Sequence, residues 1–379
     1  MPKISPAFSE IGRGFAAYLA PPSPDVIRFT VGQPDFDTPD PVVQSAVDAL
    51  HRGETAYTRS QGSVSLCEAV SEHLQTLKIQ SNPDDVVVTP GCKQALLYAL
   101  MTAITPGDEV LLLAPAWPSY DGMIRIFGGI PVHVPVTRPS YHPDFDALEA
   151  SVTPRTKAIM LNSPNNPTGA VYTQEEIEKI AEFAERHDIW IVDDMIYSTL
   201  VWSEHGYFSP INFPGGEHRT VTIGGWSKGW AMTGWRVGYL AGRKEVIKAS
   251  STLQSQSTSN VCSFVQRGAL AALEIKKEFF DNINNKYDER REILFQGLKK
   301  IKGIYINPPD GAFYAFPKLP NKTISSVAFC NKSLEDYGLV VVPGQAFGDD
   351  QCIRISCASS IHKIEDGLTR LEKAIKTYY

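Results

Sequence analysis

The chain has 379 residues, which exceeds the size at which one hydrophobic core usually stops growing, so about two domains are expected. Its formal net charge of −6 lacks the basic excess of a nucleic-acid-binding surface, and no apolar run approaches the roughly 20 residues that span a bilayer. The six cysteines contain no Cys-x-x-Cys pair and the first residues lack the apolar core of a signal peptide, so we expect a cytoplasmic protein without disulfides or a bound metal.

Between residues 84 and 242, short apolar runs alternate with helical patterns. The runs that we predict as strands are 86–89, 110–114, 157–161, 189–192, 220–223 and 237–241. We predict a helix over 92–104, and the capping-box pattern of residues 173–176 opens another that ends near His187. Because the strands are apolar on both faces, we predict an α/β fold with an open, mainly parallel sheet that helices cover on both sides.

The last hundred residues follow a different pattern, which is typical of a smaller α+β domain. Its predicted elements are a helix over 274–302, the segment 311–316, a further helix, strands within 339–342 and 352–356, and a final helix over 364–378. The proline-rich first 35 residues or so are expected to join it. We therefore predict a large domain over 39–280, and a small domain formed by 1–38 and 281–379.

Polar or aromatic side chains follow five of the predicted strands, and ligands of open α/β sheets bind beyond the carboxyl ends of strands. Each group has a plainer interpretation, such as a turn for 162–169 or packing for Trp117. Their repetition along one sheet nevertheless predicts a ligand site. The groups are Gly91-Cys92-Lys93, Trp117, Asn162–Gly169, Asp193-Asp194 with Tyr197, and Ser227-Lys228.

The segment 225–236 carries a single lysine, Lys228, among small and aromatic residues. Taken alone, it is also compatible with an ordinary lysine in a glycine-rich loop. A lysine kept from water or held beside another cation loses part of its preference for the charged form, which an amine needs before it attacks a carbonyl. Ser227 and Arg236 suggest a nearby phosphate. A buried carboxylate such as Asp194 is costly unless a cation meets it, and a protonated ring nitrogen would be such a cation.

These motifs together resemble the class I/II aminotransferases, the fold-type I enzymes that use pyridoxal 5′-phosphate, and most closely the aspartate aminotransferase branch. The resemblance runs from about Gly32 to the last helix. It implies a transaminase that moves an amino group from an L-amino acid to a 2-oxo acid such as 2-oxoglutarate. The residues that carry it are Asn-Asn-Pro-Thr-Gly at 165–169, Asp194 to Tyr197, the lysine segment 227–236, and Ile-Arg-Ile-Ser at 353–356.

The resemblance implies catalytic roles for residues on several strands. Lys228 forms the internal aldimine with the cofactor and, once freed, moves a proton between the substrate Cα and the cofactor, which leaves the pyridoxamine form. Asp194 keeps the pyridinium nitrogen protonated. Tyr197 and Asn166 hydrogen-bond the ring phenolate oxygen, and Trp117 stacks on the ring.

The resemblance also implies how the cofactor phosphate is held. Ser227, Arg236 and the backbone amides at Gly91, Cys92 and Lys93 surround it. Cys92 stands where the family usually has a smaller or hydroxyl residue, so no bond from its side chain to the phosphate is expected. Tyr57 resembles the family tyrosine that reaches a phosphate in the other subunit. This implies a homodimer with shared active sites.

The expected substrate site contains Gly32, Lys93, Trp117, Asn166 and Arg354. Arg354 binds the α-carboxylate in a bidentate manner, assisted by the backbone of Gly32 and the side chain of Asn166. Lys93 lies in the first turn of a helix, where a cation opposes the helix dipole. In a similar branch of the family, a lysine here meets the distal carboxylate of an acidic substrate. Aspartate is therefore the favoured donor, although Lys93 could instead serve the phosphate or solvent.

Other functions remain open at this point. Aromatic or alanine-type aminotransferases have the same motifs, and carbon–sulfur β-lyases use the same cofactor and the same early chemistry. A transcription regulator with an aminotransferase-like domain needs an added DNA-binding module. Only about 30 residues precede Gly32 and the net charge is negative, so a regulator is not expected.

Overall fold

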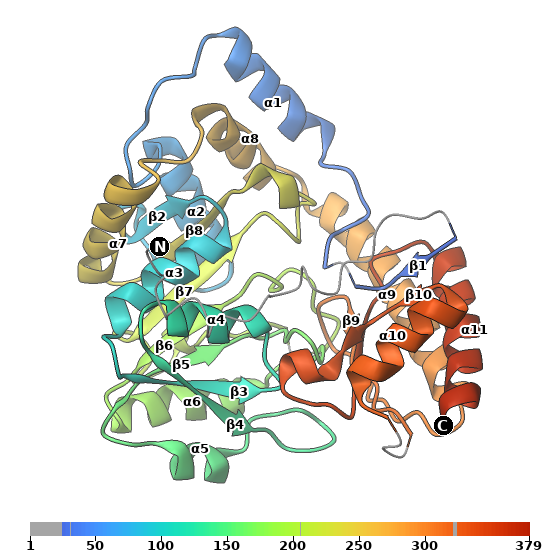
Figure 1. Ribbon diagram of the computed structural model, residues 1–379. Helices are drawn as coiled ribbons and strands as arrows, with labels where there is room; N and C mark the ends of the chain where they lie inside the picture. Colours follow the sequence, from blue (N-terminus) through green and yellow to red (C-terminus); the bar gives the residue numbers. More distant parts are fainter. Residues whose placement is uncertain (1–24, 31, 205, 321–323) are drawn as a thin grey trace, which may run out of the picture.

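The computed structural model describes residues 25–30, 32–204, 206–320 and 324–379. A seven-stranded sheet forms its centre, in the order β2-β8-β7-β6-β5-β3-β4 (Figure 1). All neighbouring strands are parallel except β8, which runs antiparallel to β2 and β7. The predicted α/β fold with a mainly parallel sheet is confirmed. The strands are β2 (Val86–Thr89), β3 (Glu109–Ala114), β4 (Ile130–Pro135), β5 (Thr156–Leu161), β6 (Trp190–Asp194), β7 (Thr220–Gly225) and β8 (Gly238–Ala241).

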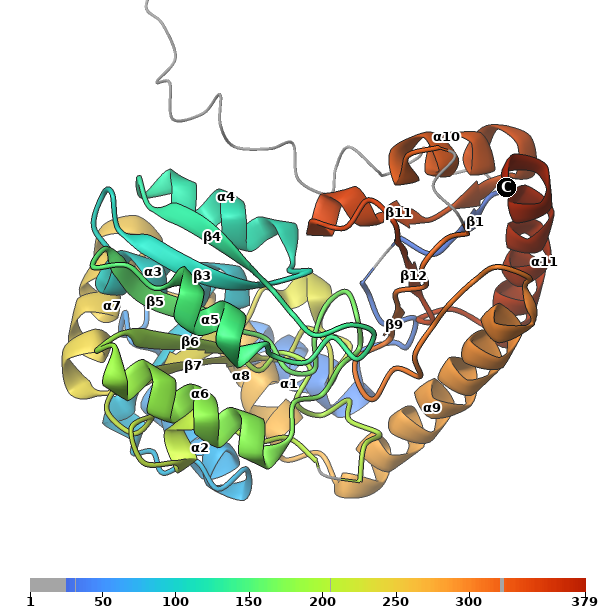
Figure 2. The same cartoon turned by 90° about the horizontal axis from the view of Figure 1, so that it is seen from below.

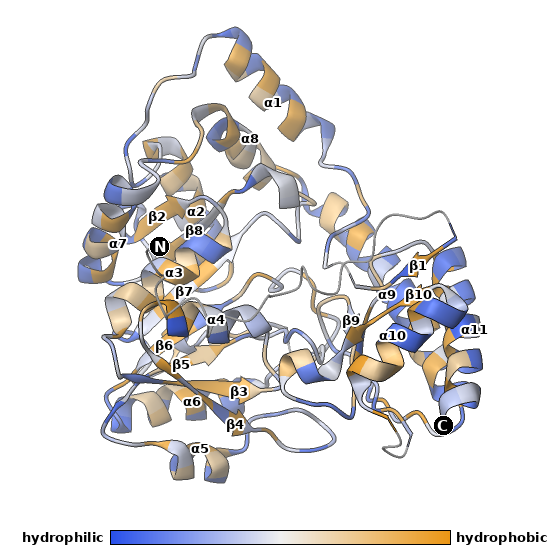
Figure 3. Ribbon diagram, in the orientation of Figure 1, coloured by the Kyte–Doolittle hydropathy of each residue, from blue (hydrophilic) through white to orange (hydrophobic). Residues whose placement is uncertain are grey.

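Helices cover both faces of this sheet. One face packs against α3 (Cys92–Ala103), α4 (Pro118–Ile126) and α7 (Lys244–Ser257). The other packs against α1 (Asp40–His51), α2 (Val64–Thr76), α5 (Phe145–Ser151), α6 (Gln174–Arg186) and α8 (Ser263–Leu273). Figure 3 shows that the strands are largely apolar, whereas the helices have one apolar and one polar side. A sheet covered on both faces requires this distribution.

Most element boundaries lie within two residues of the predicted ones. The capping box of α6 forms as predicted, because Thr173 Oγ1 accepts a hydrogen bond from the Glu176 backbone and Glu176 accepts one in return. β4 is missing from the predicted strands. Only its Pro131 and Val134 are buried. Proline has no backbone N–H to donate to a neighbouring strand, and both features suit the edge of a sheet, where β4 lies.

A second hydrophobic core lies in the C-terminal part of the molecule, beside the central sheet (Figure 2). Ile27 and Phe29 are buried in this core, so the described end of the N-terminal segment packs there. Its helices are α9 (Lys277–Lys300), α10 (Ser326–Tyr337) and α11 (Ile361–Tyr378). Its strands are β1 (Ile27–Arg28) paired with β10 (Leu339–Val340), and β11 (Val342–Pro343), β12 (Ile353–Ser356) and β9 (Tyr314–Ala315) in a second sheet.

The predicted domain boundaries stay predictions. Residues 1–24 of the predicted small domain lie outside the described residues, and α9 spans the predicted boundary at 280/281. α9 begins three residues later than predicted, and α11 begins three residues earlier, where Ser360 caps it. None of the helices within the described ranges has the length and apolar character needed to cross a membrane.

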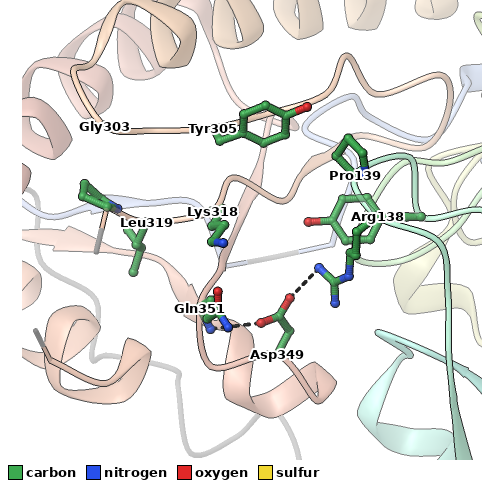
Figure 4. A pocket seen from close by; sticks show the side chains of 10 residues that line it. Arg138, Pro139, Gly303, Tyr305, Lys318, Leu319, Asp349 and Gln351 are labelled. Carbon is green, nitrogen blue, oxygen red and sulfur yellow. Dashed lines mark hydrogen bonds and ion pairs between the residues drawn. The ribbon is translucent and has the colours of Figure 1, made fainter. Parts of the chain in front are cut away.

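The turn after β4, which belongs to the central part, contacts the C-terminal part. Arg138 Nη1 lies 2.7 Å from Asp349 Oδ2 across this contact (Figure 4). The Arg138 guanidinium also lies over the ring of Tyr141, at 4.6 Å from its centroid. These residues border a cavity of about 870 Å³, whose lining includes none of the predicted site residues.

Candidate active site

A smaller cavity, of about 300 Å³, lies where the central sheet meets the C-terminal part. It brings together most of the predicted site residues, although they come from segments far apart in the chain. Gly91 lies beside it, at the start of α3. Tyr57 is 89% exposed and is not part of the lining. The predicted residues that line the cavity are Gly32, Cys92, Lys93, Trp117, Asn166, Asp194, Tyr197, Ser227, Lys228, Arg236 and Arg354.

Lys228 follows β7 and extends into this cavity, where its Nζ donates a hydrogen bond to the carbonyl oxygen of Gly32. Burial lowers the pKa of Lys228 to about 8, and the positive charges of Arg354 and Arg236 add to this effect. A lysine with this pKa loses its proton more easily than one in water. The structure therefore supplies the environment that a nucleophilic amine requires.

Asp194 is the last residue of β6 and is buried against α4. Its Oδ2 accepts a hydrogen bond of 2.7 Å from the hydroxyl of Tyr120. Burial raises the pKa of Asp194 to about 6, while the Tyr120 bond lowers it. Among the described residues, no protein cation forms an ion pair with this carboxylate. A cationic group of a ligand would therefore stabilise its charged form.

The N-terminus of α3 forms one end of the cavity. Gly91 precedes it with a φ of 82°, and no side chain caps the helix. A Cβ atom at Gly91 would lie 2.4 Å from Nη2 of Arg236, so glycine allows the arginine to approach the helix end. The Cys92 thiol donates instead to the carbonyl oxygen of Gly224, at 3.1 Å. Backbone amides, Arg236 and Ser227 thus form an anion-binding arrangement.

Arg354 of β12 is 2% exposed and also lines the cavity. Its Nη1 donates to Asn166 Oδ1 at 2.9 Å, and its Nη2 donates to the carbonyl oxygen of Thr30 at 2.6 Å. Burial lowers the pKa of this guanidinium, but arginine keeps its charge at neutral pH. The structure therefore holds a buried, oriented cation in this cavity.

Lys93 and Trp117 lie together in the cavity. The Lys93 ammonium is 5.0 Å from the centroid of the Trp117 ring, which is the geometry of a cation–π contact. Burial, and then the charge of Arg236, lower the pKa of Lys93. An anion bound at Lys93 would offset both effects.

Several lining residues were not predicted from the sequence. Tyr120 lies one helical turn after Trp117, so its position had a local signal, whereas Asn162 already belongs to the predicted group 162–169. Thr30 contributes a backbone carbonyl to Arg354, for which no side-chain pattern exists. The residues of the lining that were missed are Thr30, Leu96, Tyr120, Ile196 and Tyr314.

Comparisons with known proteins agree with this arrangement. The model of the family described as aminotransferase class I and II matches residues 24–371. The chain belongs to this family. The aminotransferase is 41% identical over 360 residues to a probable aspartate/prephenate aminotransferase of Aquifex aeolicus, a match that covers 93% of this chain and 91% of that protein.

Solved structures are similar over almost the whole aminotransferase. An aspartate aminotransferase from Thermus thermophilus with maleate has a TM-score of 0.89 and 38% identity, and the match covers 92% of each chain. An aromatic aminotransferase from Pyrococcus horikoshii has a TM-score of 0.90 and 34% identity, covering 94% of this chain and 97% of that one. The predicted family and the predicted enzyme class, a transaminase, are confirmed. Aminotransferases of this family use pyridoxal phosphate as their cofactor.

Proposed function

We propose that this enzyme binds pyridoxal 5′-phosphate in the 300 Å³ cavity and moves the amino group of L-aspartate to 2-oxoglutarate. The observation that carries the substrate proposal is the presence of two cations, Lys93 and Arg354, in the cavity that contains the Lys228 amine. A dicarboxylic substrate can meet both cations with its two carboxylates. The names of the relatives support the same choice.

The residues of the cavity fit the cofactor. The uncapped start of α3, Arg236 and Ser227 would hold its phosphate, and Trp117 would stack on its ring. Asp194 would meet the ring nitrogen, because among the described residues no protein cation forms an ion pair with its buried carboxylate. Lys228 would hold the aldehyde carbon covalently.

Pyridoxal phosphate, when bound, supplies a carbonyl for the substrate amine and a ring that accepts the electron pair released at Cα. Arg354 binds the α-carboxylate of the amino acid, and its two hydrogen bonds to Asn166 and Thr30 keep the guanidinium in place. Once the substrate amine has replaced it, the Lys228 amine takes the proton from Cα, and its lowered pKa raises the share of the neutral form that can accept this proton. The buried walls exclude water from this proton transfer.

We also propose that the enzyme works as a cytoplasmic homodimer. All six cysteines carry free thiols, which suits a reducing compartment. Tyr57 is 89% exposed, and Val64 and Leu50 nearby in sequence are also exposed large apolar residues. A second copy of the chain would cover this surface. The Tyr57 of each subunit would then lie at the cofactor phosphate of the other subunit.

Three other substrates are tested in the same experiment. Prephenate is a second candidate acceptor, because the Aquifex aeolicus relative is named an aspartate/prephenate aminotransferase and prephenate is also a dicarboxylic oxo acid. An aromatic donor is a third, because of the aromatic aminotransferase from Pyrococcus horikoshii. Cystathionine tests the β-lyase alternative, which releases pyruvate and ammonia without an acceptor.

The experiment follows the absorbance of the purified, cofactor-loaded enzyme after each amino acid is added. We expect aspartate and glutamate to change the absorbance at the lowest concentrations, and 2-oxoglutarate or prephenate to restore it. Pyruvate formed from cystathionine at a comparable rate, or an absorbance unaffected by any dicarboxylic amino acid, would contradict the proposal.

Lys93→Ser tests the role of Lys93 in substrate choice. Loss of one charged hydrogen bond costs about 1.5–3 kcal/mol, so kcat/KM for aspartate should fall roughly 10- to 150-fold. The value for phenylalanine should change little, because this donor has no distal carboxylate. Lys93→Arg, which keeps the charge, is the control and should retain most of the preference. Equal losses for both donors would show that Lys93 serves the cofactor instead.

A further inference from the structure

Tyr314 lies in β9, next to the strand that carries Arg354, and it is 2% exposed. Its ring centroid is 4.4 Å from the guanidinium carbon of Arg354. Its hydroxyl is 2.9 Å from the hydroxyl of Tyr197, which follows β6 of the central sheet. One side chain therefore contacts the carboxylate-binding arginine and the predicted partner of the cofactor oxygen.

The backbone of Gly32 confines the same hydroxyl. A Cβ atom at Gly32 would lie 2.0 Å from the Tyr314 oxygen, so only glycine allows this approach. The carbonyl oxygen of Gly32 accepts the hydrogen bond from Lys228. The Tyr314 hydroxyl is thus enclosed between Tyr197 and the segment that contacts Lys228.

We propose that Tyr314 is a positioning residue that links carboxylate binding at Arg354 to the hydroxyl of Tyr197. This inference rests on the proposed function and on the role that the family resemblance implies for Tyr197, a hydrogen bond donated to the phenolate oxygen of the cofactor. A hydroxyl group has one proton. Because Tyr197 gives its proton to the cofactor, Tyr314 is the donor in the bond between the two tyrosines. A chain of hydrogen bonds polarises its members, so Tyr314 makes Tyr197 a stronger donor.

The charge of Arg354 acts on the hydrogen bonds that run from Tyr314 through Tyr197. Burial raises the pKa of both tyrosines, so both hydroxyls keep their protons, while the Arg354 cation opposes that rise at both Tyr314 and Tyr197. A cation beside the ring strengthens the hydroxyl as a donor. A substrate carboxylate on Arg354 offsets this charge and weakens the donation. The other ionisable groups that act on the pair are Asp194 near Tyr197 and Cys357 near Tyr314.

The test is a spectroscopic pH titration of the cofactor-loaded enzyme, with no turnover. Tyr314→Phe keeps the ring under Arg354 and removes only the hydroxyl. In this variant the cofactor phenolate loses part of its stabilisation. The pKa of the bound cofactor, read from its absorbance, should therefore rise by roughly 0.5–1 unit. Saturation with succinate, an unreactive dicarboxylate, should raise this pKa in the parent enzyme. It should raise the pKa less in Tyr314→Phe.

Tyr287→Phe is the matched control. Tyr287 is fully buried in the same core, and its hydroxyl has no hydrogen-bond partner among the described residues. Its loss should leave the titration unchanged. In a Tyr197→Phe background, the further change Tyr314→Phe should add no shift, because Tyr314 acts through Tyr197.

Three results would overturn the inference: a parent-like titration in Tyr314→Phe, an equal shift in Tyr287→Phe, or additive shifts in the double variant. These three results can be interpreted only if the parent enzyme binds the cofactor and the absorbance of the bound cofactor changes with pH. A parent protein that takes up no cofactor would instead refute the proposed function. Equal thermal unfolding midpoints for parent and Tyr314→Phe show that the shift is not a loss of folding.

Discussion

The two neighbouring aspartates at the end of β6 lie on opposite faces of the sheet. Side chains alternate across a strand, so Asp194 faces the cavity and Asp193 faces the other side of the sheet. Asp193 accepts hydrogen bonds from the hydroxyls of Tyr207 and Ser209, both at 2.7 Å. Burial raises its pKa to about 7. The alternation of the strand therefore leaves a single carboxylate for the proposed cofactor.

The lowered pKa of Lys228 gives a pH dependence for cofactor uptake. The neutral amine is the reactive form, and its fraction rises as the pH passes through about 8. The rate at which cofactor-free enzyme takes up pyridoxal phosphate should therefore rise with pH and level off above this value. Stopped-flow absorbance measures the rate. A midpoint near 10.4, the value of a free lysine, would contradict the assigned environment, and Lys228→Ala should form no covalent complex.

At the scale of elements, the site is built at the ends of strands and the starts of helices. α3 begins directly after β2, and α4 begins soon after β3, so each carries its first residues into the cavity. These positions leave backbone amides without intrahelical partners, which suits an anion. α6 differs, because its own capping box satisfies its first amides and it takes no part in the site.

Thr173→Ala tests the cap of α6. Loss of an N-cap hydroxyl should lower the free energy of unfolding by about 1 kcal/mol. Thr252→Ala is the control, because Thr252 is exposed within α7 and its hydroxyl only bonds the Lys248 carbonyl of its own helix. This change should stay within about 0.5 kcal/mol. Urea denaturation of both variants measures the difference, and equal losses would show that the cap contributes nothing.

At the scale of the whole molecule, the cavity lies between two hydrophobic cores. Asn166 follows β5 of the central sheet and Arg354 lies in β12 of the C-terminal part, so the hydrogen bond between them connects the two sides. The Arg138–Asp349 pair makes a separate contact between the same parts, at the larger cavity (Figure 4). The site therefore depends on the packing of the two parts as well as on each one.

The proposed homodimer with shared active sites predicts complementation between two defective subunits. Tyr57→Phe should weaken cofactor binding roughly tenfold, and Lys228→Ala should abolish covalent binding. In a mixed dimer, the intact Lys228 of one subunit meets the intact Tyr57 of the other. Random pairing should therefore restore parent-like affinity at roughly a quarter of the sites, measured by cofactor titration after the subunits are exchanged. If the mixture contains no sites that bind the cofactor with parent-like affinity, Tyr57 does not contribute to the active site of the neighbouring subunit.

Much of the fold and most of the cavity lining could be predicted because their signals are local. Apolar runs mark the strands, and the residues that follow them, such as Lys93, Trp117 and Lys228, must lie at the sheet end where ligands bind. β4 gave no such signal, since this edge strand with prolines buries only Pro131 and Val134 and therefore forms no apolar run.

Contacts between distant segments required the three-dimensional structure. The Arg354–Thr30 bond joins residues 324 positions apart, and the Tyr197–Tyr314 bond joins residues 117 positions apart. No periodicity relates such pairs, because only tertiary packing brings them together. The positions of most strands along the chain and the candidate role of Lys228 follow from short stretches of sequence. The partners that hold Arg354, Asp194 and Tyr197 in place follow from tertiary packing.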